Sequence, residues 1–251
     1  MVNFVGAGCG AADLITVRGK TLIEQADVII YAGSLVNPQL LEYAKKDCQI
    51  YNSAYMTLEQ VIDVIKAAEH EKKMTVRLHT GDPSLYGAIR EQMDRLDKLG
   101  IKYDICPGVS SFCGAAAALR AEYTLPDVSQ TVIITRMAGR TPVPEKESIA
   151  ALAAHNATMV IFLSTGLLKE LSAELIRGGY KPDTPAAIVY KASWADQKVC
   201  RCTVEDLAQT AADNGITKTA LICVGYFLGN DYSLSKLYDK SFETEFRKAE
   251  I

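Results

Sequence analysis

Residues 74–87 read Met-Thr-Val-Arg-Leu-His-Thr-Gly-Asp-Pro-Ser-Leu-Tyr-Gly. Residues 74–78 have the composition of a strand, and the Gly81-Asp82-Pro83 turn ends it. Apolar residues at helical spacing then predict a helix over 85–99, closed by Gly100. A strand, a glycine turn and a helix in this order are typical of an α/β fold.

The same pattern continues on both sides of this stretch. A strand at 2–5 is followed by the glycine loop 6–10 and a helix over 17–25, and a strand at 101–106 runs through Pro107-Gly108 into a helix over 110–119. We expect a further strand at 28–31 and a helix from about residue 58, with Thr57 as its N-cap. Later strands are expected at 131–135, 158–163, 186–190, 199–204 and 221–224, and a later helix from 167.

Residues 121–130 interrupt this order, because they show no sustained period and contain a proline. We therefore expect an N-terminal α/β domain at 1–120, a linker at 121–130 and a C-terminal α/β domain at 131–251.

The composition excludes several classes of protein. Of the 251 residues, 49% are hydrophobic and 23% charged, and the net charge of −3 offers no global field to attract nucleic acid. No apolar run approaches the roughly 18 residues of a membrane span, and the first residues lack the basic start of a signal peptide. We expect a cytoplasmic protein without nucleic-acid or membrane partners.

The cysteines and histidines show no metal-binding spacing. The seven cysteines include no Cys-x-x-Cys pair, and the three histidines are scattered at 70, 79 and 155. We expect no metal site and reduced cysteines that serve as small core residues.

The first glycine loop, residues 6–11, nearly fits the dinucleotide-binding fingerprint. In that motif an acidic residue follows the second strand, where it reaches a ribose. Asp27 instead precedes the strand at 28–31, so a nicotinamide-binding role is disfavoured. The loop can equally be a plain turn from strand to helix.

Three glycine-containing turns follow predicted strands in the first half: the loop 6–10, residues 79–87 and residues 107–111. Ligands of open α/β sheets collect at the carboxyl ends of strands, so the three turns together indicate one ligand crevice. Each has a structural explanation as well, since Asp82 can simply cap the following helix.

These landmarks resemble the tetrapyrrole methylases. The resemblance rests on the Gly-x-Gly-x-Gly loop, Asp-Val-x-x-Tyr at 27–31, Gly-Asp-Pro-x-x-Tyr-Gly at 81–87 and Pro-Gly-Val-Ser-Ser at 107–111. Residues 31–36, 129–145 and 235–240 narrow it to the branch that methylates carbon 11 of precorrin-4 or its cobalt form, in the synthesis of the corrin ring of cobalamin. It covers essentially the whole chain.

This resemblance implies two α/β domains with a cofactor cleft between them, a homodimer, and S-adenosylmethionine as methyl donor, with S-adenosylhomocysteine as product. The implied cofactor contacts are Thr80, Gly81, Asp82, Ser110, Ser111, Phe162, Leu163, Ala192, Thr219 and Ala220. The family often has Gly-Pro-Gly-Asp where this chain reads Gly8-Cys9-Gly10-Ala11. That loop lies on the substrate side in the family, which makes Gly8 and Gly10 substrate candidates.

The substrate bears many carboxylates, which arginine and lysine side chains recognise. Arg136, Arg140 and Lys191 follow predicted strands and are the substrate-binding candidates, although solvated surface charge is the ordinary role of such residues. His79 and Asp82 are the candidates for proton transfer. Methylation of another precorrin ring position, or a non-catalytic protein that binds corrinoids or adenosylmethionine, remains an alternative.

Overall fold

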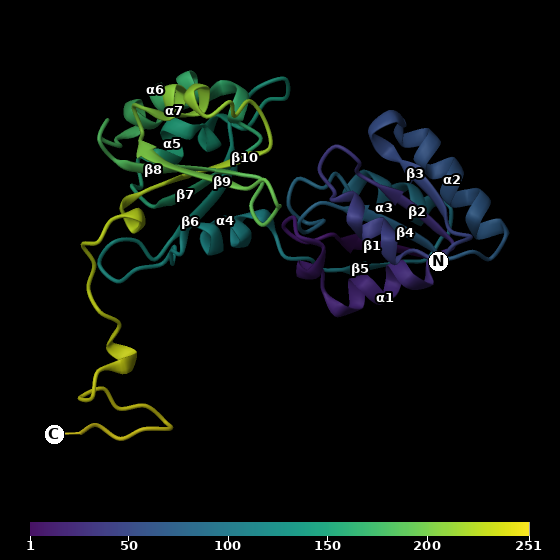
Figure 1. Cartoon of the computed structure of the whole chain (residues 1–251), viewed down its shortest axis with the longest axis horizontal. Helices are drawn as coiled ribbons and strands as arrows, with labels where there is room; N and C mark the ends of the chain where they lie inside the picture. Colours follow the sequence, from purple (N-terminus) through teal and green to yellow (C-terminus); the bar gives the residue numbers. More distant parts are fainter. Residues whose placement is uncertain (251) are drawn as a thin grey trace. The chain divides into compact units, whose positions relative to one another are not determined.

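The computed structural model describes residues 1–250, which form two compact units, each with its own five-stranded sheet (Figure 1). Residues 1–118 and 191–197 make the first unit, and the rest of the described chain makes the second. The expected α/β fold with two sheets is confirmed. Residues 121–130 belong to the second unit and contain neither helix nor strand.

The first unit has an entirely parallel sheet with the strand order β3-β2-β4-β1-β5. Its strands are β1 (Val2–Gly6), β2 (Val28–Tyr31), β3 (Gln49–Asn52), β4 (Thr75–His79) and β5 (Tyr103–Cys106). Strands β1 and β4 are buried along their whole length, because apolar clusters cover both faces of the sheet. Because the five strands run parallel, all five carboxyl ends lie at one edge of the sheet.

The helices of this unit are α1 (Val17–Gln25), α2 (Leu58–His70), α3 (Arg90–Lys98) and α4 (Ser111–Leu119). Helix α2 begins with the capping box expected at Thr57, whose hydroxyl accepts from the Gln60 amide while the Gln60 side chain accepts from the Thr57 amide. The helix expected from residue 85 begins only at Arg90. Tyr86 and Ala88 have φ values of +56° and +49°, a left-handed conformation that interrupts a right-handed helix.

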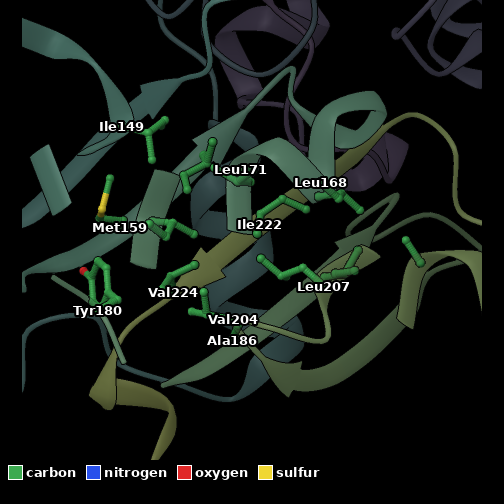
Figure 2. Packing of buried hydrophobic residues seen from close by; sticks show 14 of the residues in the cluster. Ile149, Met159, Leu168, Leu171, Tyr180, Ala186, Val204, Leu207, Ile222 and Val224 are labelled. Atoms are coloured by element: carbon green, nitrogen blue, oxygen red, sulfur yellow. The ribbon is translucent and has the colours of Figure 1, made fainter. Parts of the chain in front are cut away.

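The second unit has a mixed sheet with the order β6-β7-β10-β8-β9, in which only β6 and β7 run parallel. Its strands are β6 (Val132–Arg136), β7 (Thr158–Phe162), β8 (Pro185–Tyr190), β9 (Lys198–Thr203) and β10 (Ala220–Val224), and its helices are α5 (Ile149–Ala153), α6 (Leu168–Gly178) and α7 (Leu207–Asp213). The three helices pack on one sheet face, where Met159, Leu171 and Ile222 form the centre of the core (Figure 2).

Short 3₁₀ turns complete the chain: η1 (Ala12–Leu14), η2 (Pro38–Tyr43), η3 (Ser53–Tyr55), η4 (Glu145–Glu147), η5 (Thr165–Leu167), η6 (Tyr226–Leu228) and η7 (Lys236–Tyr238). Among residues 1–250, no helix is both long enough and apolar enough to cross a membrane.

Candidate active site

The three glycine turns of the first unit meet at the carboxyl edge of its sheet. Gly6 at the end of β1 is paired with His79 at the end of β4, and the Ala7 amide donates to the His79 carbonyl at 2.7 Å. Beyond the strands, Gly8 and Gly81 form an isolated bridge in which the Gly81 amide donates to the Gly8 carbonyl at 2.9 Å. The second turn is thus joined directly to the first.

The third turn touches the other two through bare backbone. A Cβ atom on Gly6 would lie 2.5 Å from the Gly108 Cα and 2.6 Å from the Gly81 carbonyl oxygen, closer than real Cβ atoms approach. Only glycine fits there, so the centre of this edge consists of peptide groups. Such a surface suits a ligand that is recognised by backbone hydrogen bonds.

Asp82 holds the second and third turns together. Its Oδ2 accepts from the Gly108 amide at 2.8 Å, and its Oδ1 accepts from the Ser84 amide at 2.9 Å and from the Ser84 hydroxyl. Burial raises the pKa of Asp82, but the Ser84 hydroxyl and the two amides outweigh it and lower that pKa below its ordinary value. Asp82 is therefore an ionised, fully engaged carboxylate.

The hydroxyl residues expected at the cofactor lie around these turns. Thr80 is half-buried and its hydroxyl donates to the Leu35 carbonyl at 3.4 Å. Ser110 is buried directly before α4, and Ser111 is the first residue of that helix. A Cβ on Gly81 would lie 3.4 Å from the Ser111 amide nitrogen, so the second and third turns are in contact here too.

His79 lies beneath this edge, inside the first unit. Its side chain is 4% exposed, its ring centroid lies 6.0 Å from that of Phe4, and its Nε2 has no hydrogen-bond partner among the described residues. Burial, and then the positive charge of Arg77, lower the pKa of His79 to about 3. The imidazole is neutral at physiological pH.

Arg77, on the same face of β4, is also buried and lacks a carboxylate partner in the described chain. Its Nε donates to the Gln92 side chain at 3.0 Å and its Nη1 to the Ile30 carbonyl at 3.0 Å. Burial lowers the pKa of Arg77 to about 10, which still leaves it charged. This charge adds to the effect of burial, which is the larger cause of the lowered pKa of the neighbouring imidazole.

The segment 191–197, which follows β8 in sequence, packs on the first glycine loop. The Ala11 amide donates to the Ser193 hydroxyl at 2.9 Å, and a Cβ on Gly10 would lie 2.3 Å from Cδ1 of Trp194. The Lys191 ammonium pairs with Asp196 at 2.6 Å and lies 5.2 Å from the Trp194 ring centroid. The substrate candidates Gly10 and Lys191 are therefore brought together by Trp194.

Three of the expected residues, Ala192, Gly8 and Gly10, are buried in this part of the first unit. Ala192 is buried, and a Cβ on Gly114 of α4 would touch its side chain at 3.4 Å. Gly8 and Gly10 are buried as well, and the Asn37 side chain fixes the loop by donating to the Gly10 carbonyl at 2.9 Å.

In the second unit, the register brings the remaining cofactor candidates to one edge of the sheet. The ends of β6, β7 and β8 and the start of β10 share this edge, which places Phe162 and Ala220 on neighbouring strands. Leu163 and Thr219 have φ values of +52° and +57°. A β-branched threonine rarely adopts that conformation, and such strain is most common at functional sites.

The two arginine candidates differ in their surroundings. Arg136 ends β6, and its guanidinium donates to the carbonyls of Met137 at 3.1 Å, Thr141 at 3.2 Å and Pro142 at 2.8 Å. Arg140 lies in the loop thus enclosed and is exposed. Arg136 shapes the loop, and Arg140 is the arginine that this loop presents to solvent.

Sequence reasoning did not find Ser193, Trp194 and Asn37. Trp194 is the only tryptophan of the chain and lies three residues after Lys191, yet neither fact indicates which glycine it covers. Asp27, by contrast, has a structural role, since its carboxylate accepts from Lys45 at 2.5 Å and from the Met74 amide at 2.7 Å.

No group of three or more His, Cys, Asp or Glu side chains within residues 1–250 is arranged to hold a metal ion. All seven cysteines are free thiols, and burial raises the pKa of Cys202 to about 11 and that of Cys223 to about 12.

Comparison with known proteins gives consistent matches. The family model described as Tetrapyrrole (Corrin/Porphyrin) Methylases matches residues 1–208. The cobalt-precorrin-4 C(11)-methyltransferase of Methanocaldococcus jannaschii is 58% identical over 99% of this chain and 96% of its own length. The precorrin-4 C(11)-methyltransferase of Pseudomonas aeruginosa is 44% identical over 99% of each chain.

A solved structure agrees with these sequences. The X-ray structure of a cobalt precorrin-4 methyltransferase aligns with a TM-score of 0.89 and 47% identity, and the alignment covers 91% of this chain and 96% of that one.

Proposed function

The chain belongs to the tetrapyrrole (corrin/porphyrin) methylases, and from this membership we propose that it transfers the methyl group of S-adenosylmethionine to carbon 11 of precorrin-4 or cobalt-precorrin-4. The observation that carries the proposal is the 58% identity, over nearly the whole chain, to a relative named for this reaction. Relatives at 58% and 48% identity are named for the cobalt form and those at 46% and 44% for precorrin-4, which favours the cobalt-containing substrate.

The bare backbone where the three turns meet fits the proposed cofactor. Peptide groups of Thr80, Gly81 and Asp82, with the hydroxyls of Ser110 and Ser111, would hold the polar groups of S-adenosylmethionine. We assign Phe162, Leu163, Ala192, Thr219 and Ala220 as further cofactor contacts. When bound, the cofactor supplies an electrophilic methyl group on a sulfonium, so the hard chemistry does not fall to a side chain.

The chain itself then contributes the alignment of the methyl group with the substrate carbon that accepts it. Asp82 keeps two turns in register through its two engaged oxygens. For Asp82 and His79 we propose positioning rather than proton transfer, because the first has its oxygens occupied and the second is buried and neutral.

On the substrate side we propose Gly8, Gly10, Arg140 and Lys191 as contacts, with Arg136 shaping the loop that carries Arg140. Charge-assisted bonds from Arg140 to a substrate carboxylate contribute on the order of 1.5–3 kcal/mol. We further propose a homodimer in the cytoplasm, where the seven thiols stay reduced.

The decisive experiment incubates the protein with precorrin-4, cobalt-precorrin-4 and the neighbouring corrinoid intermediates, each with methyl-¹³C-labelled S-adenosylmethionine. Mass spectrometry detects the transfer, and NMR locates the labelled carbon. We expect label at carbon 11, and faster transfer with the cobalt form. Label at another ring carbon would show that the protein methylates a different ring position. Cofactor binding without any methyl transfer would favour a non-catalytic protein that binds corrinoids or adenosylmethionine.

A further inference from the structure

The segment that joins the second glycine turn to helix α3 has an unusual backbone. Tyr86 and Ala88 have left-handed φ values of +56° and +49°, which residues with a Cβ atom adopt only rarely. Gly87 between them is required as well, because a Cβ there would lie 2.2 Å from the Pro83 carbonyl oxygen. A backbone of this kind persists only where its surroundings hold it. Residues 86–88 therefore depend on contacts that keep them in this conformation.

The side chain of Gln92 supplies one such contact. Gln92 lies in the first turn of α3 and is 5% exposed, and its Nε2 donates to the Ala88 carbonyl at 3.0 Å. Its Oε1 accepts from Nε of Arg77 at 3.0 Å. One buried amide thus joins the left-handed Ala88 to the middle of strand β4.

Arg77 determines which way the Gln92 amide faces. A guanidinium has only donors, so the oxygen of Gln92 must face Arg77, and its NH₂ group is left for the Ala88 carbonyl. Arg77 is itself anchored, because its Nη1 donates at 3.0 Å to the carbonyl of Ile30 on the neighbouring strand β2. The sheet, Arg77, Gln92 and Ala88 therefore form one continuous chain of hydrogen bonds.

The burial of Arg77 indicates that this chain does more than stabilise the fold. Arg77 is in register with Phe4 and Ile30, two members of an apolar cluster that an apolar side chain at position 77 could join. Burying a guanidinium there costs solvation free energy, and no carboxylate within residues 1–250 forms an ion pair with it. An arginine at this position is therefore better explained by the group that it orients than by its contribution to stability.

The turn held in this way carries the proposed cofactor contacts Gly81 and Asp82. Its two ends are in backbone contact, since a Cβ on Gly87 would collide with Pro83, the residue after Asp82. A movement of residues 86–88 would therefore reach Asp82, whose Oδ2 accepts from the Gly108 amide of the third turn.

We propose that Arg77 and Gln92 are positioning residues, which hold residues 86–88 in their left-handed conformation and so keep the second glycine turn in the shape that binds S-adenosylmethionine. This assignment rests on the proposed function, because it takes the turn as part of the cofactor site. Arg77 acts through Gln92, and Gln92 acts through the Ala88 carbonyl.

Gln92→Glu separates the two bonds of this side chain. The carboxylate still accepts from Arg77, and more strongly than the amide, but it cannot donate to the Ala88 carbonyl. We expect an unfolding free energy in urea close to that of the wild type, because the new ion pair offsets the lost bond. Release of one left-handed residue should lower the population of the binding-competent turn, and with it the affinity for S-adenosylhomocysteine in calorimetry, about tenfold. Gln25→Glu makes the same chemical change at an exposed residue of α1 and should alter neither quantity.

Hydrogen exchange and kinetics locate the effect of Gln92→Glu. The amides of residues 86–92 should exchange faster than in the wild type, whereas those of β10 in the second unit should not change. The KM for S-adenosylmethionine should rise about tenfold, with a smaller effect on kcat. A loss of folded protein alone would instead lower the apparent kcat and leave KM as it is.

The double variant Arg77→Met with Gln92→Leu distinguishes positioning from stability. Each single replacement leaves a buried polar group of the other residue without its partner, so stability should fall, and the double variant should recover much of the loss. Its affinity for S-adenosylhomocysteine should nevertheless stay about tenfold below that of the wild type.

Wild-type affinity in the double variant or in Gln92→Glu, or unchanged exchange over residues 86–92, overturns the proposal. A flat titration of the wild-type protein with S-adenosylhomocysteine would contradict the proposed function instead. The exchange measurement would still decide whether Arg77 and Gln92 hold the turn, because it requires no ligand.

Discussion

Replacing His79 by phenylalanine distinguishes a buried packing residue from a proton carrier. The imidazole is buried against Phe4, its Nε2 is unpartnered in the described chain, and its pKa is lowered to about 3 by burial and by Arg77. Phenylalanine keeps a flat ring in this place and removes the unsatisfied nitrogen. We expect it to be tolerated near neutral pH, with a change in unfolding free energy below about 1.5 kcal/mol.

The pH dependence of the unfolding free energy gives the size of the contribution that His79 makes. In the unfolded chain the pKa of a histidine is about 6.5, so at lower pH the unfolded state binds a proton that the folded state excludes. The folded pKa is depressed, so the stabilisation is fully present above about pH 6.5 and is lost as the pH falls toward 3. At about 1.4 kcal/mol per pH unit, the wild type should lose about 2 kcal/mol at pH 5 through this residue, and the variant should not.

Urea unfolding at about pH 7.5, 6 and 5 measures this difference. The matched control is His155→Gln. Because His155 is exposed, this replacement should leave the pH dependence of the unfolding free energy as it is in the wild type. Parallel stability losses for the wild type and His79→Phe would refute the reasoning. A His79→Phe protein of normal stability whose methyl transfer falls a hundredfold would refute it as well, since that result would indicate that His79 takes part in proton transfer.

Other replacements address the turns and loops one by one. Asp82→Asn puts an NH₂ group against one amide that now donates to the carboxylate, so stability should fall by about 1–3 kcal/mol in urea unfolding and S-adenosylhomocysteine affinity should fall in calorimetry. Arg136→Ala should raise hydrogen exchange over 137–142 and raise the KM for the tetrapyrrole about tenfold, with unchanged cofactor affinity. Gly10→Ala should displace Trp194 and change the emission of this single tryptophan.

Local signals predicted much of the fold. The Thr57–Gln60 capping box was predicted because both partners lie within one turn. The strand ends and the three glycine turns were predicted because breaks in apolar runs are read from neighbouring residues. Strand β3 (Gln49–Asn52) was not predicted, since it lies at the edge of the sheet and is half exposed, with little apolar pattern.

Contacts between distant residues could not be predicted in this way. No pattern in the sequence indicates that residues 191–197 pack with the first glycine loop, because Ser193 and Ala11 are far apart along the chain. The late start of α3 was missed for a different reason. Leu85 and Ile89 have helical spacing, and only the backbone reveals the left-handed residues between them.

The chemistry of the site explains why its residues are hard to identify by type. Where the turns meet, the surface is peptide backbone, and a Cβ on Gly6 or Gly108 would collide with the neighbouring turn. Every residue type presents the same backbone amide and carbonyl groups, so the proposed contact positions such as Thr80 should tolerate substitution of the side chain. The constrained side chains are those that hold the backbone in place, namely Asp82 and Asn37, each through hydrogen bonds to a glycine of another turn. Replacement of Asp82 should therefore impair cofactor binding more than replacement of Thr80, and replacement of Asn37 should weaken substrate binding through Gly10, although Asn37 need not touch a ligand at all.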